Sequence, residues 1–303
     1  MADVRTIAFT RVIKDKLFAG NEFVRNSTSH DSEVNNDKVQ IPGSGTISAI
    51  EEDRSSYPIT VETRTDDRVE YDLIEFSTPL IRIPEKDRVE LSYDKTASVL
   101  RQFTNKLADS VALRALYNWA EAAPQVETTG TAAAGIAPPG GTGNRQPLEL
   151  VDLANAAAIL DGQNVSQMGR YLIVPSLVYW NFVNNNKAQL LNLDYNRTLT
   201  NEDIASGIVA KVYGWNIVPR SYTVVYDNTD ALKAVGAATA ATDQWGMVGF
   251  QMDEVCRALG SIKIYSQLNA PEYQADLYSA TIRFGSAKMR SDGVGVVTIR
   301  QDT

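Results

Sequence analysis

Residues 94–122 read DKTASVLRQFTNKLADSVALRALYNWAEA, which is the longest stretch of the chain with a helical repeat. Ser92 or Asp94 can cap its start, and Pro124 ends it. At 1.5 Å per residue such a helix is roughly 40 Å long, which is typical of a structural spine. Apolar residues spaced three, four and seven positions apart form its buried face: Val99, Leu100, Phe103, Leu107, Val111, Leu113, Leu116, Tyr117 and Ala120.

The segment ahead of this helix has the two-residue repeat of β-strands. Ile59, Val61 and Thr63 alternate with polar residues, residues 65–68 form a polar turn, and the alternation resumes at Val69. The sequence therefore predicts a long, charged hairpin within residues 59–83. Because an isolated two-stranded hairpin is marginally stable in water, we expect a second domain or a second subunit to support it.

Residues 1–45 have scattered apolar side chains in a polar background that ends at Pro42-Gly43-Ser44-Gly45. This pattern predicts an arm that lies on another surface. Phe9, Phe18 and Phe23 have no obvious partner close in sequence, so we expect them to anchor the arm.

After residue 122 the predicted elements are shorter and of both kinds, so the fold class is α+β. A Gly- and Pro-rich loop covers residues 128–144, a break between two β pieces is expected at Tyr213-Gly214, and turns are expected at Gly285, Gly293 and Gly295. The predicted helices are Leu148–Leu160, Ser176–Val183 and a short one through Met252, Val255, Cys256 and Leu259; the predicted strands are Tyr171–Val174, two pieces in Ile208–Val218, Met247–Phe250 and several short ones in Ile262–Ile299.

The composition excludes several functional classes. With 44% hydrophobic and 22% charged residues the chain is globular, and its longest apolar runs are too short to cross a membrane. The formal net charge is −8, and residues 51–95 contain thirteen acidic and seven basic residues. Since a protein that binds nucleic acid neutralises phosphates, this charge has the wrong sign for strong DNA binding.

The residues that usually perform catalysis are scarce. A single histidine, His30, lies in a polar segment and is expected to be solvated; the single cysteine, Cys256, is expected to be a buried structural thiol on a helical face. Neither the P-loop nor the serine-hydrolase or zinc-protease motifs occur. The sequence therefore predicts no catalytic residue, no cofactor site and no metal site.

The order of these elements resembles the major capsid proteins of tailed bacteriophages that have the Hong Kong 97 fold. The resemblance extends over nearly the whole chain, and four segments carry most of it: Phe76–Pro84 ahead of the long helix, Arg170–Ser176 entering a helix, Ile208–Val218 with its Gly-Trp-Asn-Ile turn, and Gly249–Cys256.

The resemblance implies an N-terminal arm at 1–45, an extended hairpin (E-loop) at 46–90, a P-domain with the spine helix at 91–145 and 260–303, and an A-domain at 146–259. It also implies hexamers and pentamers in an icosahedral shell around double-stranded DNA. Expected partners are a scaffolding protein, a portal and a decoration protein, with weak DNA contact and no membrane. The chain would be made in the bacterial host cytoplasm and reside in the virion capsid. The residues predicted at subunit interfaces are Phe9, Phe18, Phe23, Arg64, Asp66, Asp67 and Arg68.

Other functions remain open at this stage. An encapsulin-like nanocompartment shell would have the same fold and enclose protein cargo. A carboxylate-based hydrolase and a multimeric surface-binding protein are alternatives from other classes.

Overall fold

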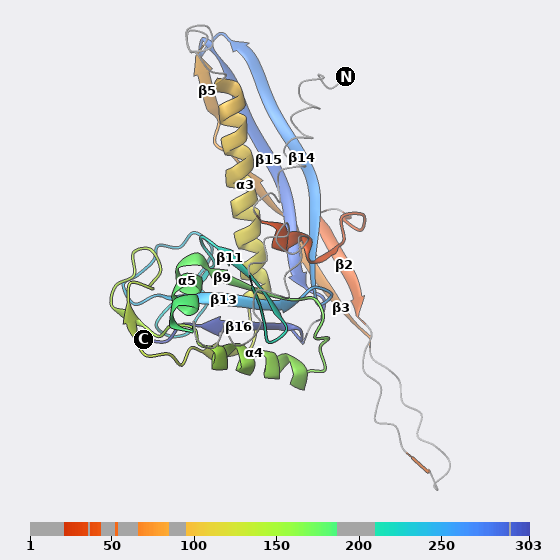
Figure 1. The fold of residues 1–303 in the computed structure, drawn as a ribbon. Coiled ribbons are helices and arrows are strands. Elements are labelled where there is room, and N and C mark those ends of the chain that lie inside the picture. The colour runs from red at the N-terminus through yellow and green to blue at the C-terminus, as the bar shows by residue number, and fades with distance from the viewer. Residues whose placement is uncertain are drawn as a thin grey trace.

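The computed structural model describes residues 21–35, 37–43, 52–53, 66–84, 95–186, 210–290 and 292–303. One long helix, α3 (Lys95–Ala120), joins an elongated sheet to a compact sheet, as Figure 1 shows. Its apolar face is buried from Phe103 to Trp119, so the predicted spine helix is confirmed. Among the described residues, no helix is long and apolar enough to span a membrane.

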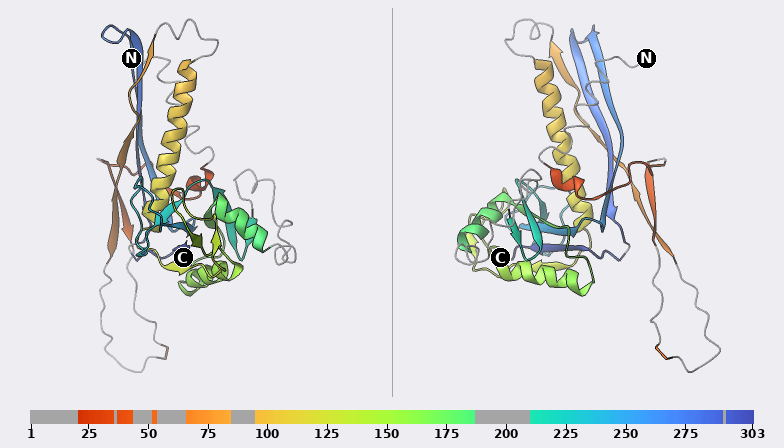
Figure 2. Two further views of the ribbon diagram at one scale, coloured as in Figure 1. Left: turned by 90° about the vertical axis from the view of Figure 1, so that its left-hand side faces the viewer. Right: turned by 45° about the vertical axis from the view of Figure 1, so that its right-hand side comes forward.

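The elongated sheet is built on two long antiparallel strands, and α3 packs along the second of them (Figures 1 and 2). Two short strands pair with that second strand, and one pairs parallel with the first. The strands are β1 (Thr28–Ser29), β4 (Ile74–Ser77), β5 (Ile81–Pro84), β14 (Val255–Ala270) and β15 (Ala275–Lys288).

The long strands correct two predictions. The expected short helix through Cys256 is the first part of β14. Most of the expected series of short strands in Ile262–Ile299 is one continuous hairpin, followed by one short strand at Val296–Arg300. Gly285 lies inside β15 and not at a turn. A Cβ atom there would come within about 3.0 Å of the Tyr71 ring and the Asp72 carbonyl, so the glycine permits close approach of the neighbouring strand.

The compact sheet has seven strands within the described residues, in the order β10-β11-β9-β13-β16-β6, with β12 also paired to β13. Side chains alternate between its faces: Ile173 packs towards α3, whereas Leu172 and Val174 pack towards two shorter helices. The elements are β6 (Gln125–Glu127), α4 (Leu150–Gly162), β9 (Arg170–Pro175), α5 (Ser176–Asn185), β10 (Ala210–Val212), β11 (Trp215–Arg220), β12 (Val224–Tyr226), β13 (Gln244–Gln251) and β16 (Val296–Arg300).

These elements confirm most of the predictions for the central part of the chain. Strands β10 and β11 are separated by Tyr213 and Gly214, both with positive φ, as the predicted break requires. The predicted helix at 176–183 is α5, whose first helical residue is Ser176 and whose N-cap is Pro175. Within the 128–144 loop, β7 (Ala133–Ala134) pairs with β8 (Asn144–Arg145).

A two-stranded ribbon projects beside the elongated sheet, formed by β2 (Lys38–Gly43) and β3 (Asp67–Asp72); Figure 2 shows it from two further sides. The predicted turn was wrong: Asp67 and Arg68 lie in a strand opposite Gly43 and Pro42. The predicted partner strand at 59–63 lies outside the described residues.

The part of the N-terminal segment that is described belongs to the core, which corrects the prediction of a separate arm. Phe23 is 1% exposed and contacts Trp119 edge to face, 6.4 Å between ring centroids. The 3-10 helix η1 (Glu22–Arg25) carries it. Arg257 Nη1 donates a 2.6 Å hydrogen bond to the Val24 carbonyl. Residues 21–43 therefore stabilise the fold of their own chain.

Candidate subunit-interface surface

The residues predicted at subunit interfaces fall into three groups. Asp66 and Arg68 are exposed on the ribbon, and Asp67 is the first residue of β3. Phe23 is buried within its own chain and is not free to contact another subunit. Phe9, Phe18 and Arg64 lie outside the described residues.

The apolar side of the ribbon is covered by the same chain. Val39, Ile41 and Tyr71 are buried together with Cys256 and Ala258 of β14. The sequence predicted support from a second domain or a second subunit. For this ribbon, another part of the same chain supplies the supporting surface.

The opposite side of the ribbon carries a ladder of exposed charges. Lys38 Nζ lies 2.9 Å from Glu70 Oε1 and 3.3 Å from Asp72 Oδ1. The hydrogen bond from Lys38 lowers the pKa of the Glu70 carboxyl, and hydrogen bonds to both carboxylates raise the pKa of Lys38. At the ribbon base, Arg283 pairs with Asp37 and Glu75. Such exposed pairs contribute little to stability and are available for intermolecular contacts.

Large apolar side chains are exposed at the far end of the elongated sheet. Tyr265 and Leu268 near the end of β14 and Tyr273 in the turn before β15 are about half exposed. Apolar side chains exposed to water do not stabilise a monomer, so these three are candidates for contacts between molecules.

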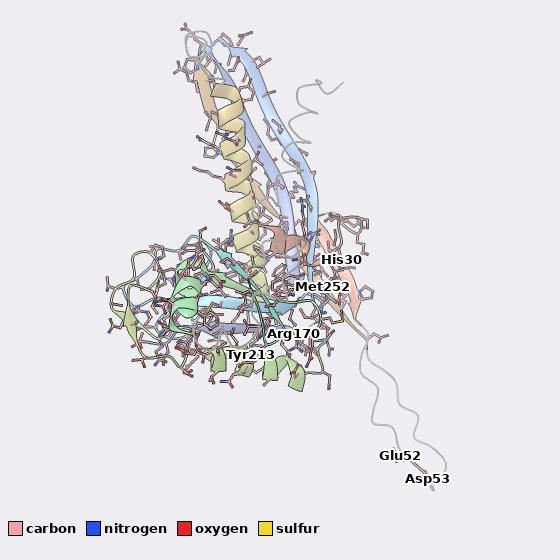
Figure 3. All side chains as sticks on the ribbon, viewed as in Figure 1. His30, Glu52, Asp53, Arg170, Tyr213 and Met252 are labelled. Carbon is pink, nitrogen blue, oxygen red and sulfur yellow. The ribbon has the colours of Figure 1, made fainter. Side chains whose placement is uncertain are left out.

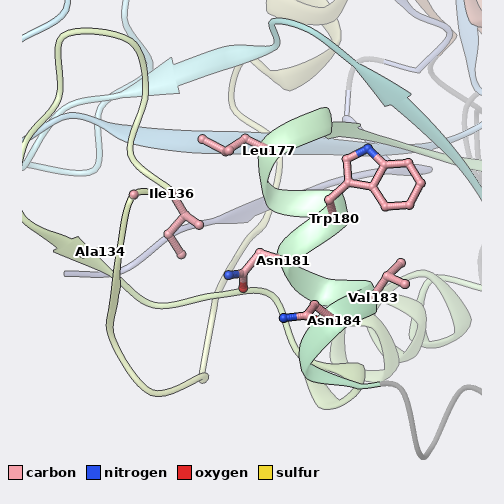
Figure 4. Close-up of a pocket in the computed structure, with 8 residues that line it drawn as sticks. Ala134, Ile136, Leu177, Trp180, Asn181, Val183 and Asn184 are labelled. Atoms are coloured by element: carbon pink, nitrogen blue, oxygen red, sulfur yellow. The ribbon is translucent and has the colours of Figure 1, made fainter.

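The compact sheet exposes apolar side chains at both ends of its strand β9. At the carboxyl end, α5 presents Leu177 and Trp180, and Trp180 is 63% exposed. Both line a hollow of about 570 Å³ whose other wall includes Ile136 (Figure 4). At the amino end, Met168, Met252 and Tyr213 are exposed, and Figure 3 labels the last two beside Arg170.

The predictions made from the sequence do not decide whether Trp180 is a core residue or an interface residue. The helical repeat separates the two roles, because Val178, Tyr179 and Phe182 are buried while Leu177 and Trp180 are exposed. The exposed pair at i and i+3 is the signal that could have located this surface.

The two candidate reactive side chains are both buried in the structural framework. His30 is 8% exposed, which corrects the prediction of a solvated histidine, and its Nδ1 lies 2.6 Å from Glu33 Oε2. Cys256 Sγ donates to the Ala287 carbonyl at 3.3 Å, and burial raises its thiol pKa to about 11. The thiol is buried as predicted, although on a strand.

Cys256 does not have the surroundings of a nucleophilic cysteine. Nucleophilic cysteines require a lowered thiol pKa, which is the reverse of the shift at Cys256. Within the part of the chain that the structure describes, no three His, Cys, Asp or Glu side chains are grouped to hold a metal ion.

Comparison with solved structures identifies the fold. The capsid of the cyanophage P-SCSP1u is 17% identical with a TM-score of 0.62, over 90% of this chain and 86% of that chain. The capsid of Ralstonia phage GP4 is 10% identical with a TM-score of 0.63, over 91% and 86%. A virus-like particle from Pyrococcus furiosus is 10% identical with a TM-score of 0.56, over 98% and 100%. No family model and no curated protein matches the chain.

These likenesses cover nearly the full length of the chain and of the structures that it matches. The chain therefore has the α+β fold of phage capsid proteins, and the fold implied by the resemblance is confirmed.

Proposed function

We propose that this chain is a major capsid protein, which assembles into the hexamers and pentamers of an icosahedral shell around phage double-stranded DNA. The observation that supports it most strongly is the joining of two sheets by α3 into one elongated body with exposed apolar side chains at its ends. Trp119 strengthens this junction, because it packs on Phe250 of the compact sheet and donates to the Cys256 carbonyl of the elongated sheet. A body of this shape suits a tile in a shell, in which each subunit contacts several others.

The structural elements suggest how the family's domains map onto the chain. We assign the ribbon to the E-loop, α3 with the elongated sheet to the P-domain, and the compact sheet to the A-domain. Strand β16 pairs with β13 and β6 in the compact sheet. Residues 296–300 therefore join the A-domain in this assignment, whereas the sequence boundary placed them in the P-domain.

The proposed role is structural, in the virion, and requires no catalytic group. A scaffolding protein, a portal and a decoration protein are the partners that this role implies. Contact with packaged DNA is expected to be weak and spread over many subunits, since the chain has a net charge of −8. Two cations at and after the end of β15 are engaged locally: Lys288 donates to the Glu121 carbonyl, and Arg290 pairs with Asp292 at 2.6 Å.

Electron microscopy of the purified recombinant chain, alone and co-expressed with its scaffolding protein, tests the proposal. We expect closed shells of uniform diameter in at least one of the two preparations. Only monomers or irregular aggregates in both preparations would overturn it.

A nanocompartment shell is the second candidate, and the likeness to the Pyrococcus furiosus particle over 98% of the chain favours it. The contents of particles isolated from the natural host distinguish the two. Nuclease-protected double-stranded DNA supports the phage shell, whereas a stoichiometric cargo protein without DNA supports the nanocompartment.

A further inference from the structure

Two features at opposite ends of strand β9 are complementary in shape. The first is Trp180, which projects from α5 directly after the carboxyl end of the strand (Figure 4). Its indole is 63% exposed and lies edge to face with Tyr179, 5.2 Å between ring centroids. The other three tryptophans, Trp119, Trp215 and Trp245, are buried.

The second feature is a hollow of about 330 Å³ at the amino end of the same strand, between α4 and the β10–β11 turn. Its walls are small: Ala154 and Ala158, one turn apart, are exposed on α4, and Gly214 lies in the turn. Tyr213, which is about half exposed, adds an aromatic edge. The hollow exceeds the volume of one indole side chain.

A buried cation forms part of this wall. Arg170 is 1% exposed, and its guanidinium is fixed by three hydrogen bonds: Nε donates to the Ser166 carbonyl, and Nη2 donates to the Val165 carbonyl and to Asp161 Oδ1 at 2.6 Å. The hollow also has two polar lining residues, Asp161 and Gln167. A guanidinium held at the wall of such a hollow attracts the face of an aromatic ring.

We propose that Trp180 of one subunit inserts into the hollow formed by Ala154, Ala158, Arg170 and Tyr213 of the next subunit. This inference rests on the proposed function and names the contact that joins neighbouring subunits within a capsomer. Tryptophan inserted in a small-walled pocket with an arginine is the usual composition of an interface hot spot.

The positions of the two features suit a ring. Strand β9 has six residues, so Trp180 and the hollow are separated by about 17 Å of strand and lie at its opposite ends. A contact between different surfaces of identical subunits repeats from copy to copy and closes into a ring when the rotation allows. Each copy has a net charge of −8. Leu177, Asn181 and Asn184, which lie near the indole on α5, are uncharged, so they place no like charges opposite the next copy.

Three variants test the contact. Trp180→Ala removes the indole, and Ala158→Phe fills the hollow from an exposed helix position. We expect each to raise the protein concentration needed for assembly about tenfold or more, with unchanged thermal melting of the monomer. Asn155→Phe is the matched control, since Asn155 is an exposed neighbour on α4 that does not line the hollow. It should assemble like the wild type.

Acrylamide quenching of tryptophan fluorescence gives a direct measurement. One of the four tryptophans is accessible in the unassembled chain, and we expect that quenchable fraction to disappear in the assembled shell. If shells form while Trp180 stays quenchable and both test variants assemble at the wild-type concentration, the contact is wrong and the capsid function stands. If the wild-type chain forms no particles, the proposed function fails and this contact fails with it.

Discussion

At the scale of single residues, buried arginines hold together segments that are distant in sequence. Arg220 Nε donates to Asn21 Oδ1 at 2.9 Å, Nη1 to the Tyr222 carbonyl at 2.8 Å, and Nη2 to the Asp109 carbonyl at 3.2 Å. Its guanidinium also lies over the Phe23 ring. This residue thereby joins β11 to α3 and to the N-terminal segment.

Replacement of this arginine should therefore be costly. We expect Arg220→Ala to lower the free energy of unfolding by about 2–4 kcal/mol, because buried acceptors lose their donor. Urea denaturation followed by circular dichroism measures it. Arg101→Ala, at an exposed position on α3, is the control and should change stability by less than about 0.5 kcal/mol. An equal effect of the two substitutions would contradict the role given to Arg220.

The single thiol reports on the integrity of the junction between ribbon and elongated sheet. Burial raises the thiol pKa of Cys256 to about 11, so at pH 8 only about one molecule in a thousand carries the thiolate, which is the reactive form. We expect negligible reaction with Ellman's reagent in the native chain and rapid reaction in urea. Rapid labelling of the folded chain would contradict this.

The same shift predicts a pH dependence. Because the folded state retains the thiol proton more tightly than the unfolded chain, its contribution to stability is complete below an unfolded pKa of about 8.5 and is lost as pH rises towards about 11. The Cys256→Ser variant should lose this part of the pH dependence between those two values. Chemical denaturation at pH 8 and pH 10.5 compares the two proteins.

At the scale of elements, the N-terminal segment is part of the elongated sheet from residue 21 onwards. β1 pairs with Cys256 and Arg257 of β14, and β2 forms half of the ribbon. Val39 and Val24 are completely buried. The N-terminal segment from residue 21 onwards is therefore part of the core and not an arm that lies on another surface.

Two truncations separate the contributions. We expect deletion of residues 1–40 to abolish cooperative melting, because it removes β1, half of β2 and the side chains that cover Trp119. Deletion of residues 1–20 leaves these elements in place and is the comparison, so the difference between the two melting profiles reports on residues 21–40. Differential scanning calorimetry measures both, and cooperative melting of the longer truncation at the wild-type temperature would refute the assignment.

At the scale of the whole molecule, the ribbon projects away from the body, and its apolar side is buried against β14 of the same chain. Its charged side is exposed, and exposed ion pairs contribute little to folding stability, so this side can contact another molecule. In the proposed shell, the ribbon contacts a neighbouring subunit through this charged side and through Asp66 and Arg68.

Charge reversal tests this role. The combined change Asp66→Lys, Asp67→Lys and Arg68→Glu should leave a monomer with wild-type melting and reduce the yield of particles in gel filtration several-fold. Exchange of the exposed pair Arg290 and Asp292, which is not part of the ribbon strands β2 and β3, is the control and should assemble normally. A wild-type particle yield from the triple variant would refute an assembly role for the ribbon.

The sequence by itself determined the elements whose signal is local. The repeat of α3 extends over 26 residues, and the break between β10 and β11 is fixed by a turn that needs positive φ at Tyr213 and Gly214. The candidate interface was predicted only in part, because helical spacing reveals an exposed face on α5 and cannot reveal the hollow that α4, β9 and the β10–β11 turn build together.

Only the tertiary structure decided which strands pair and which side chains are covered. The alternation of apolar and polar residues in β3 indicates which side of the strand is apolar but does not identify its partner strand. The sequence therefore could not favour β2, some 25 residues earlier in the chain, over residues 59–63. The apolar spacing around Cys256 fits a helix as well as a strand, and the strand is adopted because β15 supplies a partner along nearly its whole length. Phe23 is buried because Trp119 and Arg220 cover it. These residues are about 100 and 200 positions away in the sequence, and no local pattern encodes such a contact.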